Sequence, residues 1–371
     1  MQQTPGLDPN MNFITCLLLF LAARPKRREL ISMGVVAIVL LACFGIRREP
    51  WQAILQVLSY GGAGGLVTAL LLPYLSRHFD WKLVGKLVFP PAFGTLTSVL
   101  LAATVSGVTY DNLLYAFDGA LGFQPDFWAG RVILQIPGMS VFARFLYEAL
   151  PLFLATAYVM EERRGGCAAR NMIAFLVLLG LCGAICFRLF PAVGSVYLYP
   201  ESFPFNPPEL SSISLVPQSV TVTAPRNCMP SLHCAWAIAF LWTSRRFSRI
   251  MRWVFTPLVA IMLLQTLEYH YLVDMIVAVP FTLAIYALTR TAVPWAARER
   301  WGSLVFGITL VLAWLLALRW FTPVFLVSEV IPWGAALLTV GLSWFLRILL
   351  DRAEARHAEH TSDRVEQNVL A

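Results

Sequence analysis

The chain has 371 residues, of which 58% are hydrophobic and 13% are charged, and its mean hydropathy is +0.68. This composition excludes an ordinary soluble globular protein and indicates a polytopic integral membrane protein. The formal net charge of +7 does not indicate a nucleic-acid partner, because the basic residues occupy short segments between apolar stretches. We expect an all-α transmembrane helical bundle, since lipid offers no partners for exposed backbone groups.

Apolar windows recur along the whole chain. A membrane-spanning helix needs about 20 mainly apolar residues, and fewer where the bilayer thins locally. About ten windows meet this need, and they cover residues 31–46, 52–75, 87–106, 145–160, 171–190, 230–243, 253–269, 271–289, 303–321 and 328–350. The shorter apolar segment Met11–Ala23 is followed by basic residues, so we expect a surface helix or a partial span there, in preference to a cleaved signal peptide.

Two connecting segments are longer than simple turns. Residues 107–144 predict an interfacial helix with a loop. Residues 191–229 are rich in proline, which excludes a continuous helix, and long ordered loops of this kind usually carry function. Most basic residues fall in the alternate segments, so the positive-inside rule places both termini in the cytoplasm and these two segments on the non-cytoplasmic side.

Two of the five histidines stand out from the other three. His78, His357 and His360 occupy charged cytoplasmic segments, where a surface role is the default. His233 and His270 are each expected in the first turn of a helix that starts at the non-cytoplasmic face. The topology therefore brings two imidazoles to one depth, although they are far apart in sequence.

The segment before His233 is suited to binding an anion. Pro230 is a favoured first helical residue, and the first N–H groups of a helix attract negative charge. Ser231 adds a hydroxyl donor, and Arg226 adds a guanidinium that can grip phosphate oxygens as a fork.

His270 has an acidic partner four residues later, Asp274. On a helix this spacing places both on one face, where the carboxylate can hold one imidazole nitrogen and leave the other to attack a substrate. A purely structural hydrogen bond is the alternative interpretation. An Asp at the centre of a span costs about 2.5–3.5 kcal/mol, however, and such groups are usually functional.

The seven cysteines form no Cys-x-x-Cys pair and no metal-like cluster with histidine, so we expect no metal and no cofactor. Cys182 and Cys186 are one helical turn apart, and packing is the simpler interpretation for them. Cys228 and Cys234 flank the helix start described above, and a disulfide between them is left open.

Pro-Ser-Leu-His at residues 230–233, together with His-Tyr-x-x-Asp at residues 270–274, resembles the type-2 phosphatidic acid phosphatase superfamily. These forms look most like its inositol phosphorylceramide synthase branch, and residues 190–197 and 118–123 are similar to further elements of that branch. The resemblance covers roughly residues 107–290. It departs from the superfamily pattern at Leu264, where an arginine is usual, and Arg188 is the nearest basic residue to a missing first motif.

The resemblance implies a six-helix phosphatase-type core and a phosphohistidine mechanism. His270 would be the nucleophile, Asp274 would orient it, and His233 would act as general acid and base. The phosphate would be bound by Arg226, Ser231 and Arg188. The implied activity is that of a lipid phosphotransferase of the inositolphosphotransferase type, and the alternatives are a lipid phosphate phosphatase and a non-enzymatic transporter or scaffold.

The implied organisation has four parts. They are N-terminal membrane spans (1–106), a catalytic core (107–290), C-terminal spans (291–350) and a cytoplasmic tail (351–371). The partner would be a membrane lipid with a phosphate head group, bound at the non-cytoplasmic side of a cell inner or plasma membrane.

Overall fold

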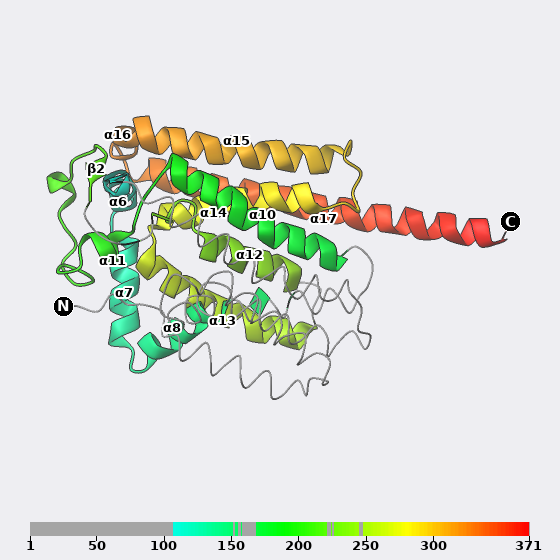
Figure 1. Ribbon diagram of the computed structural model, residues 1–371, viewed down its shortest axis with the longest axis horizontal. Helices are drawn as coiled ribbons and strands as arrows, with labels where there is room; N and C mark the ends of the chain where they lie inside the picture. The colour runs from blue at the N-terminus through cyan, green and yellow to red at the C-terminus, as the bar shows by residue number, and fades with distance from the viewer. Residues whose placement is uncertain are drawn as a thin grey trace, which may run out of the picture. The chain divides into compact units, whose positions relative to one another are not determined.

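The computed structural model describes residues 107–150, 168–220, 226–244 and 248–370, together with residues 153, 154, 157 and 224. Helices dominate this part of the chain, which confirms the all-α expectation for it (Figure 1). The helices are α6 (Asp111–Gly119), α7 (Pro125–Gln135), α8 (Met139–Glu148), α10 (Ala168–Leu189), α11 (Ser195–Leu198), α12 (Leu232–Ser244), α13 (Arg249–Tyr269), α14 (Leu272–Thr289), α15 (Arg298–Trp320), α16 (Thr322–Phe325) and α17 (Val330–Leu370).

Four described helices are long and apolar enough to cross a membrane, namely α13, α14, α15 and Val330–His357 of α17. Two shorter apolar helical stretches, Ala174–Leu189 and Leu232–Ser244, also coincide with expected spans. The expected windows 31–46, 52–75 and 87–106 and the segment Met11–Ala23 lie outside the described residues, as does part of 145–160. The chain has the helices of a multi-pass membrane protein, and the number ten stays a prediction.

The chain divides into two compact units. One comprises residues 1–103, 141–169 and 240–262, and its described core includes an aromatic contact of Phe153 with Phe240 at 5.2 Å between ring centroids. The other comprises residues 104–140, 170–239 and 263–371, and it contains every candidate site residue named above.

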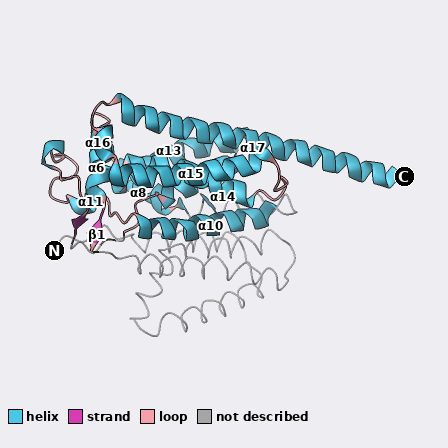
Figure 2. Ribbon diagram, turned by 90° about the horizontal axis from the view of Figure 1, so that it is seen from above, coloured by secondary structure: helices cyan, strands magenta, loops and turns pink. Residues whose placement is uncertain are grey.

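In the second unit, α14, α15 and α17 pack against one another (Figure 2). Gly307 lets α15 lie close to α14, because an added Cβ at this position would lie 2.7 Å from the Pro280 carbonyl oxygen. Small residues at such positions allow helix backbones to come together in lipid. Trp314 of α15 also donates its indole N–H to Thr339 Oγ1 of α17 at 2.9 Å.

The C-terminal end of α14 is fixed by the buried guanidinium of Arg300. Its Nε, Nη1 and Nη2 donate to the carbonyl oxygens of Ala287, Val293 and Leu288 at 3.0, 2.8 and 2.8 Å. Two of these carbonyls belong to the last turn of α14, where helix geometry supplies no partner. Ion pairs at the same end join Arg290 to Glu354 and Arg356 to Glu299.

The N-terminal end of α14 meets α6, which also packs against α15 and α16. Phe117 of α6 contacts the rings of Trp314 and Phe325, with centroids 5.3 and 4.9 Å away. With 18 residues, α14 is about 27 Å long at 1.5 Å per residue, close to the thickness of the hydrocarbon layer. Its two ends therefore suit opposite membrane faces.

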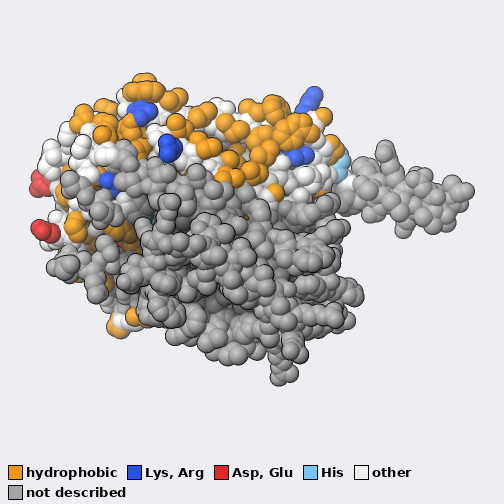
Figure 3. Space-filling view, viewed as in Figure 1, with side chains coloured by type: hydrophobic (Ala, Val, Ile, Leu, Met, Phe, Trp, Pro, Cys, Tyr) orange, Lys and Arg blue, Asp and Glu red, His pale blue; other side chains and the backbone are white. Residues whose placement is uncertain are grey.

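One face of α15 is exposed and apolar, and hydrophobic side chains cover much of the described surface along this helix in Figure 3. The exposed residues recur every three or four positions, which makes them one helical stripe. They are Trp301, Val305, Ile308, Leu312, Leu316 and Trp320. Such a stripe is typical of a helix that faces lipid.

The proline-rich segment 191–229 contains only short regular elements in its described part, as expected. These are α11, the 3-10 helix η2 (Leu210–Ser212) and the strand β2 (Gln218–Ser219). The strand β2 pairs antiparallel with β1 (Val108–Thr109), so the loop is attached to the chain just before α6. The expected interfacial segment 107–144 forms α6, α7 and the beginning of α8.

Candidate active site

The first turn of α14 is capped by two carboxylates. The Tyr271 N–H donates to Asp274 Oδ2 at 3.1 Å, inside the same turn. The N–H groups of Leu272 and Val273 donate to the two oxygens of Asp118 on α6, at 2.6 and 3.1 Å. Because the first N–H groups of a helix have no intrahelical partner, these contacts determine where α14 begins.

His270 lies before this cap and not in the first turn of α14, so the sequence expectation was wrong on this point. The helix α13 ends at Tyr269, and α14 starts at Leu272 after its N-cap residue Tyr271. His270 nevertheless reaches Asp274, with 3.5 Å between Nδ1 and Oδ2. Both residues are buried, at 5% and 0% exposure. The pair arises because the chain turns at the helix start, and not because the two residues share a helix face.

The start of α12 carries the second histidine. The helix begins at Leu232, so Pro230 precedes it and is not its first residue, contrary to expectation. Ser231 is the N-cap, and its Oγ accepts the Cys234 N–H at 3.3 Å. The Ser231 N–H in turn donates to the Asp274 carbonyl oxygen at 3.2 Å. This hydrogen bond joins the starts of α12 and α14 directly.

His233 follows Ser231 by two residues in the first turn of α12, and the hydrogen bond from Ser231 to Asp274 brings this turn to the residue that contacts His270. The His233 ring also makes an edge contact with Trp236, with 6.2 Å between centroids. The structure therefore brings His233, His270, Asp274 and Ser231 together around the starts of two helices.

Asp111 holds a third segment against the site. Its carboxylate accepts the N–H groups of Val193 and Gly194 at 2.9 and 2.8 Å and the Tyr271 hydroxyl at 3.1 Å. Asp111 thus ties the loop 191–194 to Tyr271, the residue that follows His270. The Cys228 N–H donates to the Ala192 carbonyl at 3.2 Å, so the same loop also positions the segment before α12.

Gly194 is required by geometry at this position. Its φ is +93°, a conformation that other residues rarely adopt. An added Cβ would lie 2.2 Å from the Tyr269 carbonyl oxygen and 3.4 Å from the Cys228 sulfur. Only glycine therefore lets loop 191–194 approach the junction between α13 and α14.

The two arginines of the sequence analysis occupy different environments. Arg226 is 2% exposed, and its Nη1 and Nη2 donate to the carbonyl oxygens of Ala224 and Val220 at 2.8 and 3.2 Å. Burial lowers the pKa of this guanidinium from its usual value, and the negative charge of Asp111 opposes the shift. Arg188 is exposed in the last turn of α10, three residues before loop 191–194.

Burial favours the neutral forms of the acidic side chains near the site. It raises the pKa of Asp111 and raises that of Asp118 well above its usual value, to which the neighbouring Asp126 adds. Burial also raises the pKa of Asp126 to about 6. An anion next to these groups therefore meets less repulsion than fully charged carboxylates would produce.

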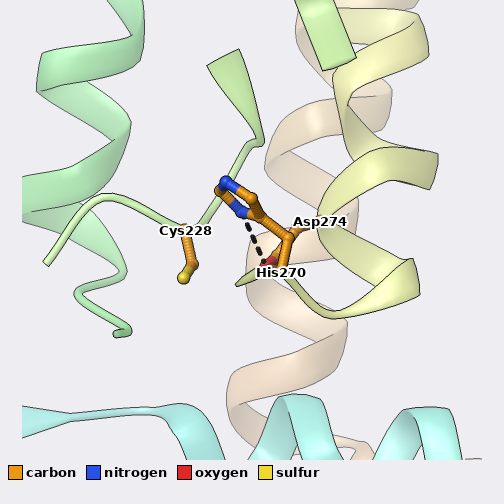
Figure 4. A group of neighbouring side chains, drawn as sticks. All are labelled: Cys228, His270 and Asp274. Atoms are coloured by element: carbon orange, nitrogen blue, oxygen red, sulfur yellow. Dashed lines mark ion pairs between the residues drawn. The ribbon is translucent and has the colours of Figure 1, made fainter. Parts of the chain in front are cut away.

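All four described cysteines are free thiols, so Cys228 and Cys234 form no disulfide with each other. Their sulfurs face backbone carbonyls on either side of the α14 start, Tyr269 at 3.9 Å and Met275 at 3.8 Å. Cys228 also joins His270 and Asp274, and one ligand atom from each residue lies within 4.8 Å of the others (Figure 4). Sequence spacing did not indicate this group as a metal site.

Sequence reasoning missed the supporting roles of Asp111, Asp118 and Cys228. Acidic residues in an otherwise apolar segment were the available signal for the first two. Their partners are 82 to 160 residues away in the chain, so the contacts depend on the tertiary fold. For Cys228 no signal in the sequence spacing was available.

Comparison with known families identifies this region. Residues 112–288 match the model of the PAP2 superfamily, a range that includes α12, the junction of α13 and α14, and both histidines. No curated protein and no solved structure matches the chain. Residues 112–288 thus belong to the PAP2 superfamily, which makes the protein a phosphatase or phosphotransferase that acts on phosphate esters.

Proposed function

We propose that the protein is a membrane lipid phosphotransferase that moves a phosphate-containing head group through a phosphohistidine at His270. The observation that supports this best is the convergence of His233 and His270 at two helix starts joined by the Ser231–Asp274 hydrogen bond. The resemblance of residues 230–233 and 270–274 to the inositol phosphorylceramide synthase branch favours transfer to an alcohol over transfer to water.

In the first half-reaction, His270 attacks phosphorus through the nitrogen that does not face Asp274. A phosphorus–nitrogen bond forms, the phosphorus–oxygen bond of the donor lipid breaks, and the departing oxygen takes a proton from His233. Asp274 holds Nδ1 and stabilises the positive charge that develops on the ring. General acid assistance of this kind contributes typically about 10²–10⁴-fold.

In the second half-reaction, the hydroxyl of the acceptor gives its proton to His233 while its oxygen attacks phosphorus. The phosphorus–nitrogen bond breaks, and His270 returns to its neutral form. His233 is then protonated and ready for the next donor. Atoms and charges therefore balance over one cycle without a further reactant.

The Ser231 hydroxyl, the N-terminus of α12 and the buried charge of Arg226 are proposed to bind the phosphate oxygens. The Ser231 Oγ already accepts the Cys234 N–H, so its own proton remains to be donated to a phosphate oxygen. Arg188 is exposed at the end of α10, and we assign it the first contact with the incoming anion.

We further propose that the site lies on the non-cytoplasmic side. The charged pairs of Arg290 and Arg356 and the buried Arg300 lie at the opposite end of α14, about 27 Å away. The positive-inside rule assigns that basic end to the cytoplasm. The four-part division of the chain, with its catalytic core at 107–290, remains part of this proposal.

Brief exposure of purified protein in lipid to a radiolabelled lipid phosphate tests the reaction. Mass spectrometry should find phosphate on His270, and His270→Ala should abolish both the label and turnover. His233→Ala should retain labelling by a donor with a good leaving group but transfer the phosphate slowly. His357→Ala, at the end of the apolar part of α17 (Val330–His357), is the matched control and should behave as wild type. Turnover by His270→Ala would refute the nucleophile assignment.

Product analysis separates transfer from hydrolysis. With an alcohol-bearing lipid present, a transferase forms a new phosphodiester, whereas a phosphatase releases free phosphate only. The second outcome would leave the histidine chemistry intact and replace the acceptor by water.

A further inference from the structure

We propose that Cys228, His270 and Asp274 form an inhibitory site for a thiophilic divalent cation of the zinc type. The three side chains come from two separate segments, the loop before α12 and the junction of α13 and α14 (Figure 4). The inhibitory effect rests on the proposed role of His270, whereas the binding site itself does not.

The donor set matches the preference of zinc. Thiolate sulfur, imidazole nitrogen and carboxylate oxygen are its usual ligands, at about 2.3, 2.0 and 2.0 Å. In a tetrahedral site such ligand atoms lie about 3.5 Å apart. The His270 Nδ1 and Asp274 Oδ2 are already 3.5 Å apart, and the three ligand atoms lie within 4.8 Å of one another. A shift of about 1 Å in the Cys228 side chain would place its sulfur so that the three ligand atoms occupy three corners of a tetrahedral zinc site.

Two of the three groups have buried polar atoms without a hydrogen-bond partner among the described residues. They are the His270 Nδ1 and the Asp274 Oδ1, on residues that are 5% and 0% exposed. The His270 Nδ1 makes the 3.5 Å ion-pair contact with Asp274 Oδ2 but no hydrogen bond, and the Asp274 Oδ1 has no hydrogen bond to the described residues; since buried polar atoms are normally paired, both atoms can accept a further ligand. The Cys228 sulfur makes a long contact to the Tyr269 carbonyl oxygen, at 3.9 Å, which a cation would easily replace.

A cation at this site would remove the nucleophile whichever imidazole nitrogen it bound. Neutral imidazole has one nitrogen with a free lone pair and one that carries a proton. A metal on Nδ1 forces the proton onto Nε2, so the attacking nitrogen loses its lone pair. A metal on Nε2 consumes that lone pair directly. The Cys228 thiol releases its proton to solvent when it binds the cation, so the balance is one metal in and one proton out.

Hard cations should not compete for the site. Magnesium prefers octahedral oxygen ligands and keeps several waters, and a thiol is a poor ligand for it. The proposed reaction requires a path for a lipid phosphate to His270, and such a path would also admit a small cation. The predicted response is therefore selective for zinc over magnesium.

The test uses the full chain in lipid, first stripped of metal, with zinc, magnesium and cobalt chlorides as probes. Wild type should bind one zinc per chain, lose turnover with zinc but not with magnesium, and recover when a chelator is added. Inhibition of each protein is expressed relative to its own metal-free rate. The zinc concentration that gives half-inhibition should be at least about tenfold higher for Cys228→Ser than for wild type. Cobalt should give a thiolate charge-transfer absorption in wild type that Cys228→Ser lacks.

Cys234→Ser is the matched control, because this buried thiol also faces a backbone carbonyl near the α14 start but lies outside the three-residue group. It should keep the cobalt absorption and the zinc sensitivity of wild type. Equal zinc sensitivity and equal cobalt absorption in Cys228→Ser and wild type would overturn the proposed site. If metal-free wild type had no turnover, the proposed function would fail, while the cobalt spectra would still decide whether the site exists.

Discussion

Replacement of Asp118 tests how the start of α14 positions the nucleophile. Asp118→Ala leaves the N–H groups of Leu272 and Val273 buried without their carboxylate. Each unsatisfied N–H group lowers the stability by about 1–3 kcal/mol, so the two together lower it by about 2–6 kcal/mol. The net loss is smaller than this, because the variant no longer has to bury a carboxyl group. The α14 start should then loosen and displace His270. Because a misplacement of about 1 Å can lower a rate by about 100-fold, kcat should fall strongly with little change in KM.

The assay compares turnover of a water-soluble phosphate ester and the midpoint of thermal unfolding for wild type and variants. Asp118→Asn keeps one acceptor oxygen, so it should retain one of the two hydrogen bonds and fall between wild type and Asp118→Ala. Glu201→Gln removes an exposed carboxylate and should change neither quantity. If Asp118→Ala unfolded at the wild-type temperature and kept the wild-type kcat, the capping argument would be refuted.

Two further substitutions test the loop and the buried acids. Gly194→Ala should lower the stability by at least about 1–3 kcal/mol, because residue 194 has a positive φ and an added Cβ would clash with the Tyr269 carbonyl oxygen. Thermal unfolding measures this loss, and an unchanged midpoint would contradict the geometry. The pKa of Asp126 is raised from 3.8 to about 6 by burial, so folding favours its neutral form and stability should fall as pH rises from about 4 to 6. Asp126 contributes about 3 kcal/mol to this loss of stability, and Asp126→Asn should abolish its contribution. Unfolding midpoints measured from about pH 4 to 6 test this, and a variant with the wild-type pH profile would refute the assignment.

The parts of the site that lie close together in sequence could be predicted from the sequence. The spacing of His270 and Asp274 indicated a pair, and Ser231 was recognised as part of a helix start. The exact helix boundaries could not be predicted, because the caps come from elsewhere in the chain. The start of α14 depends on Asp118, more than 150 residues earlier, so a pattern of nearby residues cannot determine it.

The sequence also predicted the long apolar helices better than the loop that packs against them. Apolar composition located α13, α14, α15 and the membrane part of α17, because long uncharged runs are sufficient evidence for them. The arrangement of loop 191–194 was beyond sequence reasoning, although its proline content excluded a helix. Its position depends on the Asp111 carboxylate and on the absence of a side chain at Gly194.

The helix α14 is anchored at both ends, by Asp118 at its start and by Arg300 at its last carbonyls. It therefore cannot tilt freely to match lipids with longer or shorter acyl chains. A thicker or thinner bilayer must instead deform around it, at a modest cost for each ångström of mismatch. With the site at the membrane face, as proposed, the strain of that deformation varies with the acyl-chain length of the host membrane, and we expect turnover to depend on membrane composition even when the substrate is unchanged.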